Sequence, residues 1–258
     1  MNKTTSKGSL LSPSVVCATA VELVGAAVVR MLRYRAAWYD ATREIERLRG
    51  KMIDWPELHF YEEANAAMVQ STRPRVVFIG DSITQRWDLP KYFPEFEVAN
   101  RGIGWQTTSE MLVRFRQDVI ELMPTVVVIL GGSNDFHVVS GPSHLAAVQN
   151  NIQSMIDLAN QQGILPLIGT IPPVAIDALR DREVEEFAFD SVSSYNDWLR
   201  VHFCGTRCLV VDFDLALRQS NYALSDLLPD GCHPNQLGYA LMADATKPAL
   251  MEVLSRTS

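Results

Sequence analysis

Short apolar runs that alternate with helical segments constrain the fold of this chain more than any other feature. Residues 126–130 form a continuous run of apolar, mostly β-branched side chains, which is typical of a central strand in a parallel sheet. A repeated strand-then-helix pattern predicts a parallel sheet with helices on both faces. We therefore predict an α/β fold, a three-layer α/β/α sandwich around a five-stranded parallel sheet.

The elements of this fold follow from the same pattern. The predicted strands are 75–79, 97–100, 125–130, 165–170 and 208–213. The predicted helices are 107–120, 143–162, 191–203 and 237–253. A further helix over 55–69 is expected to cover the edge of the sheet. We expect an N-terminal helical extension over 1–70 and a single α/β domain over 71–258.

Composition narrows the class of partner. The net charge of −7 argues against nucleic acid and against general adhesion to anionic membranes. Any membrane contact is therefore expected only through residues 10–29, which are largely apolar. An amphipathic helix packed on the domain is favoured there, which places the protein in the cytoplasm. A signal peptide and a membrane anchor are the two alternatives, and they imply an exported or an anchored protein.

Polar residues that suit nucleophilic catalysis follow the predicted strands. Ser82 ends the run before it in a Gly-Asp-Ser sequence, where a hydroxyl at a strand end meets the N–H groups of a new helix. Asn134 follows the central strand and has an amide able to donate to an oxyanion. Asp230 and His233 lie three residues apart, so the carboxylate can fix the imidazole tautomer. An N-cap serine and an Asx turn are the structural alternatives for the first two.

Together these residues occur in four blocks that resemble the SGNH hydrolase family, also known as GDSL esterases and lipases. The blocks are residues 80–83, 100–105, 131–135 and 230–234. The resemblance implies that Ser82 is the nucleophile, His233 the general base and Asp230 the residue that orients it. It implies an oxyanion hole made by the Ser82 N–H, the Asn134 side chain and a backbone N–H of the second block, with Asp81, Trp105 and Asn134 near the substrate.

The second block departs from the family pattern, because Trp105 stands where the family usually has a glycine. A backbone N–H remains there, but a positive φ would strain a tryptophan by about 1–3 kcal/mol. Gly104 is the alternative donor. We also expect the indole to narrow the acyl pocket.

The resemblance implies a serine esterase that needs no cofactor or metal. The implied substrate is a small-molecule or glycan ester: an acetylated carbohydrate, another short-chain ester, a lysophospholipid or an acyl thioester. An O-acyltransferase that uses the same residues and a non-catalytic binding module are the alternatives. Cys204 and Cys208 can bridge, or can hold a metal with His202, but two free thiols are favoured in a chain with so few cysteines.

Overall fold

The computed structural model describes residues 30–35, 38–45, 49–50, 52–69, 72–138, 142–178 and 185–256. The chain divides into two compact units, Met1–Trp55 and Pro56–Ser258. The second unit therefore includes residues 56–70, which the sequence assigns to the extension. The apolar segment 10–29 lies outside the described residues. Within the described part of the chain, no helix has both the length and the apolar character needed to cross a membrane.

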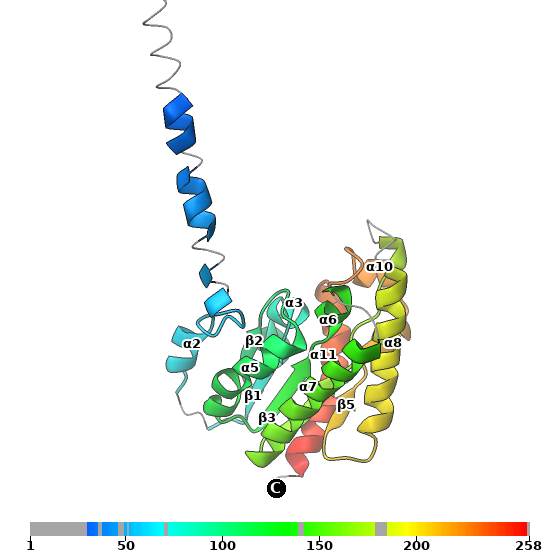
Figure 1. Cartoon of the computed structure of the whole chain (residues 1–258). Coiled ribbons are helices and arrows are strands. Elements are labelled where there is room, and N and C mark those ends of the chain that lie inside the picture. The colour runs from blue at the N-terminus through cyan, green and yellow to red at the C-terminus, as the bar shows by residue number, and fades with distance from the viewer. Residues whose placement is uncertain are drawn as a thin grey trace, which may run out of the picture. The chain divides into compact units, whose positions relative to one another are not determined.

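A five-stranded parallel sheet forms the centre of the second unit, as predicted (Figure 1). Its strands are β1 (Arg75–Gly80), β2 (Glu97–Gly102), β3 (Val126–Leu130), β4 (Leu165–Gly169) and β5 (Leu209–Val211). Their spatial order is β2-β1-β3-β4-β5, so the chain starts one strand in from an edge, adds β2 at that edge, and then passes back over β1 to add β3, β4 and β5 on the other side. Gly80 at the end of β1 is in register with Gly102 of β2 and Leu130 of β3. The carboxyl ends of these three strands therefore meet at one edge, and the loops that follow them converge there.

Helices connect the strands in the predicted order. The long ones are α5 (Thr108–Asp118), α7 (Pro142–Gln161), α8 (Glu185–His202) and α11 (Gln236–Ser255). The short ones are α2 (Glu62–Ala66), α3 (Ser82–Gln85), α4 (Leu89–Tyr92), α6 (Ser133–Val138), α9 (Phe213–Arg218) and α10 (Leu224–Leu227).

Two apolar cores cover the two faces of the sheet, because side chains alternate along each strand. Val76 and Phe78 of β1 point to one face, where they pack with residues of α4, α9 and α11. Val77 and Ile79 point to the other face, which α5, α7 and α8 cover (Figure 1). This arrangement is the predicted three-layer sandwich.

The segment between residues 56 and 69, here called the strap, is not the long helix that the sequence predicts. Only Glu62–Ala66 is helical, and the residues before it form turns. Pro56 disfavours a helical conformation for the residue before it, and Glu57 has a φ of 57°, so a regular helix cannot run through this point. The strap thus keeps backbone carbonyl groups free for contacts with the domain.

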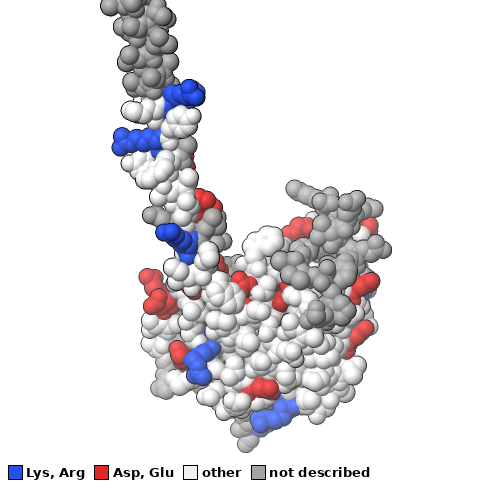
Figure 2. Space-filling model, in the orientation of Figure 1, with Lys and Arg blue, Asp and Glu red and all other residues white. Residues whose placement is uncertain are grey.

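The surface carries charge of both signs. Figure 2 shows one face of the molecule, on which acidic and basic side chains are scattered singly among uncharged ones. This mixture agrees with a net charge that is only moderately negative for a chain of this size.

Candidate active site

Ser82 is the first residue of the short helix α3, directly after β1. Asp81 caps this helix, because its Oδ1 accepts the N–H of Ile83 at 2.9 Å. The turn needs glycine at position 80: a Cβ there would lie 2.1 Å from Oγ1 of Thr84 and 2.4 Å from the carbonyl oxygen of Leu130. The tight strand-to-helix turn therefore places the Ser82 hydroxyl at the carboxyl edge of the sheet.

Ser82, His233 and Asp230 form a continuous chain of hydrogen bonds. Oγ of Ser82 lies 2.8 Å from Nε2 of His233, and Nδ1 of His233 lies 2.8 Å from Oδ2 of Asp230. His233 belongs to the loop between α10 and α11, so residues far apart in sequence meet at one point. An ionised Asp230 can only accept, so the Nδ1–H of His233 donates to it and Nε2 of the neutral imidazole accepts the Ser82 hydroxyl.

The carboxylate of Asp230 is held in its ionised form. Partial burial would raise its pKa, but three hydrogen bonds outweigh that effect and the pKa is lowered. Its Oδ1 accepts the backbone N–H groups of His233 at 2.7 Å and of Cys232 at 3.0 Å, and its Oδ2 accepts from the imidazole. Asp230 thus fixes both the loop and the tautomer of His233.

Asn134 lies beside this group on helix α6. Its Nδ2 donates to the backbone carbonyl of Gln106 at 3.0 Å, which ties α6 to the loop after β2. An amide nitrogen carries two N–H groups, so one donor remains for a ligand. The neighbouring Ser133 donates its hydroxyl to Oδ2 of Asp81 at 2.6 Å and so joins the third block to the first.

The loop after β2, residues 103–107, is here called the oxyanion loop, after the role that the resemblance implies for it. A Cβ placed on Gly104 would lie 3.7 Å from Cβ of Ser82, so the loop passes next to the serine. Trp105 has a φ of 67°, the left-handed conformation that the family glycine would adopt freely. The loop therefore keeps the expected shape and forces a tryptophan into it.

Trp105 is 82% exposed, so its indole lies largely in solvent. Two expectations from the sequence need correction here. The N–H of Gly104 already donates to Oε1 of Gln85 at 3.0 Å, so Gly104 is not the alternative donor. Asp81 is 1% exposed and its carboxylate is occupied by Ser133 and Ile83, so it does not contact substrate. Burial raises the pKa of Asp81, and these hydrogen bonds oppose the rise.

Sequence reasoning missed residues that support this site from below. Gln106 and Arg114 are 2% and 0% exposed, and Nε of Arg114 donates to Oε1 of Gln106 at 2.5 Å. The sequence pattern that could have revealed them is the spacing of Met111, Arg114 and Asp118, which puts all three on one helix face, and the structure buries that face. A cation on a buried helix face needs a partner, which marks it for a polar network.

The remaining nucleophilic and histidine side chains lie elsewhere or are inert. Burial raises the pKa of the Cys232 thiol to about 12, so it stays protonated beside His233. Asp212 does not orient the imidazole; it caps α9 and accepts from Arg200 at 2.7 Å. His144 contacts the backbone oxygen of Asp135 at 2.7 Å, and the side chain of His137 lies outside the described residues.

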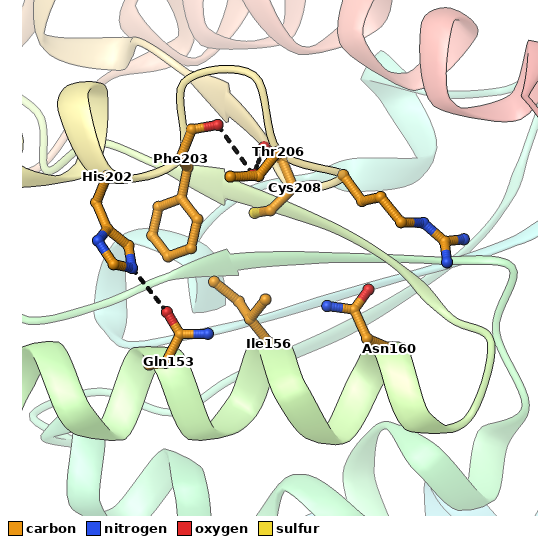
Figure 3. Close-up of a pocket in the computed structure, with 8 residues that line it drawn as sticks. Gln153, Ile156, Asn160, His202, Phe203, Thr206 and Cys208 are labelled. Carbon is orange, nitrogen blue, oxygen red and sulfur yellow. Dashed lines mark hydrogen bonds between the residues drawn. The ribbon is translucent and has the colours of Figure 1, made fainter.

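A cavity away from these residues lies toward the amino-terminal ends of the strands, between α7 and the residues that precede β5 (Figure 3). Its volume is about 140 Å³. His202 donates across its mouth to Oε1 of Gln153 at 2.9 Å, and Cys208 lines its wall. Cys204 and Cys208 are free thiols, and among the described residues no group of three metal-ligating side chains forms.

Comparison with known proteins identifies the family. A sequence model of the GDSL-like lipase/acylhydrolase family matches residues 78–241. The platelet-activating factor acetylhydrolase IB subunit alpha1 of Rattus norvegicus is 27% identical over 216 residues, which cover 78% of this chain and 84% of the relative.

Two solved structures share the fold over nearly their whole length. A candidate acylhydrolase from Bacteroides fragilis superposes with a TM-score of 0.69 and 31% identity, covering 78% of this chain and 98% of that one. A GDSL-like lipase from Bacteroides thetaiotaomicron superposes with a TM-score of 0.68 and 29% identity, covering 76% and 98%. The chain therefore belongs to the GDSL-like lipase/acylhydrolase family and is a hydrolase that acts on ester bonds.

Proposed function

We propose that this hydrolase cleaves short-chain carboxylic esters through an acyl-enzyme on Ser82. The observation that supports this most directly is the pair of 2.8 Å contacts that link Ser82 to His233 and His233 to Asp230. A nucleophile bonded to a base, with the base bonded to an orienting carboxylate, is the arrangement that activates a serine.

The reaction follows from this geometry. The Ser82 hydroxyl attacks the acyl carbon while its proton passes to Nε2 of His233, and the imidazolium is stabilised by Asp230. His233 then gives the proton to the leaving alkoxide, and the alcohol departs. Water attacks the acyl-enzyme with His233 again as base, which releases the carboxylic acid and restores the serine.

Three N–H groups are proposed to hold the oxyanion. The N–H of Ser82 lies in the first turn of α3 and has no partner within that helix. Trp105 supplies a backbone N–H from the oxyanion loop, and Asn134 supplies the N–H that its bond to Gln106 leaves over. Each such donor contributes about 10²–10³-fold to kcat in comparable sites.

The proposed substrate has an acetyl or other short acyl group. The relatives named acetylhydrolase at 27% identity support a small acyl site. The exposed indole of Trp105 is proposed to contact the bound ester from the solvent side, since Trp105 follows Gly104, whose Cβ position lies 3.7 Å from Cβ of Ser82, and is itself 82% exposed. An acetylated sugar and a short lipid ester both present an apolar surface that an indole can cover.

The nucleophile is tested by replacing it. Ser82→Ala should lower kcat by ~10³-fold or more on an acetyl ester, and a fluorophosphonate probe should label Ser82 in the wild type. Ser154→Ala is the matched control, because Ser154 is a helical serine whose hydroxyl donates to the carbonyl of Asn150, in its own helix. Labelling at Ser133, or undiminished activity of Ser82→Ala, would refute the proposal.

Two further variants in the same assay test the base and the outcome of the reaction. His233→Ala should cost about as much as Ser82→Ala, and the double variant little more, because the residues act as a unit. Asp230→Asn should cost less, since an asparagine still accepts the two backbone N–H groups. Adding a sugar acceptor separates hydrolysis from acyl transfer: we expect free acid as the main product, and predominant acylated sugar would instead indicate a transferase.

A further inference from the structure

The strap reaches the oxyanion loop although it lies outside the residues that match the family. The match covers residues 78–241, whereas the strap begins at Pro56. The carbonyl oxygen of Pro56 accepts Nε2 of Gln106 at 2.8 Å, and the hydroxyl of Tyr61 donates to the carbonyl of Gly102 at 2.5 Å. Both partners belong to the end of β2 and the loop that carries Trp105.

Gln106 uses both polar atoms of its side chain and its backbone carbonyl in one network. Its Oε1 accepts from Nε of Arg114, its Nε2 donates to the strap at Pro56, and its backbone carbonyl accepts from Nδ2 of Asn134. The side chain is 2% exposed, so these bonds have no competition from water. Gln106 is also the immediate neighbour of Trp105, and it therefore connects two of the three proposed oxyanion donors.

Arg114 connects the same network to the nucleophile. It is fully buried, and its Nη2 donates at 3.0 Å to the carbonyl of Gly80, two residues before Ser82. Its Nη1 donates to Oδ2 of Asp118 at 3.0 Å, which balances its charge. Burial lowers the pKa of Arg114, and Asp118 opposes this, so the guanidinium stays charged.

The network closes back on the strap. Asn65 of α2 donates to Oδ1 of Asp118 at 2.7 Å and accepts Nε of Arg101 at 2.8 Å. The guanidinium of Arg101 lies 4.8 Å from the centre of the Tyr61 ring. The strap thus contacts both elements that flank the oxyanion loop, which are β2 before the loop and α5 after it.

We propose that Gln106 is a positioning residue: held between Arg114 and the strap, it sets the places of Asn134 and Trp105 relative to Ser82. The inference rests on the proposed function, since it concerns the donors assigned there. Donor positions matter steeply, because a shift of about 1 Å can cost ~10²-fold in rate. Gln106 itself does not touch the substrate.

The first test replaces Gln106 with an apolar side chain of similar length. Gln106→Met removes the bonds to Arg114 and Pro56 and keeps the backbone carbonyl. We expect kcat to fall by ~10–100-fold while KM changes by less than ~3-fold, since the loss falls on the transition state. Gln153→Met is the matched control: it makes the same substitution far from the active site, where Oε1 of Gln153 accepts from His202 (Figure 3) and its Nε2 donates to Asp157. Equal kcat values in the two variants would overturn the proposal.

A double-variant cycle separates positioning from general loosening of the fold. Because Gln106 acts partly through Asn134, Gln106→Met should cost much less in an Asn134→Ala background than in the wild type. If the fall in kcat of the double variant equals the product of the falls in the two single variants, the proposal is overturned. Gln106→Glu serves if the methionine variant does not fold: it keeps the acceptor for Arg114, loses the donor to Pro56, and should show a smaller fall in kcat.

The outcome is distinguishable from failure of the proposed function. All Gln106 variants keep Ser82 and His233, so a fluorophosphonate probe should still label Ser82 in each of them. Activity that survives Ser82→Ala would refute the proposed function whatever Gln106 does. Retained labelling together with unchanged kcat in Gln106→Met would refute only the positioning role.

Discussion

Trp105 combines an unfavourable backbone conformation with an exposed side chain. Its φ of 67° costs a residue with a Cβ about 1–2 kcal/mol, and its indole is 82% exposed, so little burial repays that cost. Local strain of this kind persists where the surrounding structure imposes it, and such residues cluster at functional sites. This combination agrees with the proposed contact between Trp105 and the bound ester.

Trp105→Gly should separate the backbone role from the side-chain role. Glycine keeps the N–H and relieves the strain, so we expect kcat to stay within ~3-fold and the free energy of unfolding to stay equal or rise by up to about 1 kcal/mol. The KM should rise by ~3–30-fold because the apolar contact with the ester is lost. Steady-state kinetics on acetyl and octanoyl esters, together with denaturant unfolding, measure these quantities.

Trp105→Ala is the control for this prediction, because alanine loses the ring but keeps the strain. It should share the higher KM and lack the gain in stability. If Trp105→Gly instead improved octanoyl esters strongly and left the KM for acetyl esters unchanged, the indole would be a steric barrier to long chains. The original expectation of a narrowed acyl pocket would then hold.

Motif reading found the residues whose chemistry is visible in their own side chains and spacing. The resemblance of four blocks to the SGNH hydrolase family predicts Ser82, His233 and Asp230 together, and the structure links them by hydrogen bonds. Gln85 and Gln106 were not predicted. Their importance comes from partners 19 and 50 residues away, at Gly104 and Pro56, and only the folded geometry reveals such pairs.

The junction of α8, β5 and α9 is held by a cluster of charges. Arg200 of α8 donates to Asp212 at 2.7 and 3.0 Å and to Asp214 at 2.9 Å. Asp212 also accepts from Thr170, the residue directly after β4. Partial burial would raise the pKa of Asp212, but the hydrogen bonds from Arg200 and its neighbours outweigh it and the pKa is lowered.

Asp212→Asn should therefore lower stability in a pH-dependent way without affecting catalysis. A carboxyl whose folded pKa is lowered stabilises the protein above its unfolded pKa of about 3.9, and this contribution disappears as the pH falls through the folded value. We expect a loss of about 1–2 kcal/mol at pH 7 and a much smaller loss near pH 2, with kcat unchanged. Denaturant unfolding at both pH values measures the difference, and an equal loss at both would contradict the ion-pair explanation.

Strands and long helices were predictable because burial alone determines them. The continuous apolar run of β3 is buried on both faces, which is typical of a strand at the centre of a parallel sheet. The strap was predicted wrongly as a helix over 55–69, since its apolar spacing suits a helix while Pro56 and the positive φ of Glu57 interrupt it. The contacts that hold it are hydrogen bonds from distant residues, which no local pattern shows.

The whole catalytic unit is larger than the motifs that identify it. The family match begins at residue 78, but the compact unit begins at Pro56. Met68 at the end of the strap packs on the core face that α5 and α7 cover, and Asn65 bonds to the buried Asp118. The order of the sheet and the convergence of its loops follow from the parallel topology, whereas the lower limit of the domain depends on the strap.

Truncation at two points tests this limit. A chain of residues 56–258 should keep the kcat of the full protein within ~2-fold. A chain of residues 71–258, which starts at the boundary predicted from the sequence, loses the bonds from Tyr61, Asn65 and Pro56 to the domain. At about 0.5–1.5 kcal/mol each, these bonds predict a loss of about 2–4 kcal/mol in the free energy of unfolding and a fall in Tm of roughly 4–16 °C.

The shorter chain should also lose activity, because Gln106 loses its hydrogen bond to Pro56. Its kcat should fall by ~10-fold or more at a temperature where the shorter chain is folded. Thermal unfolding and kinetics on an acetyl ester decide the matter, and a 71–258 chain as stable and active as 56–258 would show that the strap is dispensable.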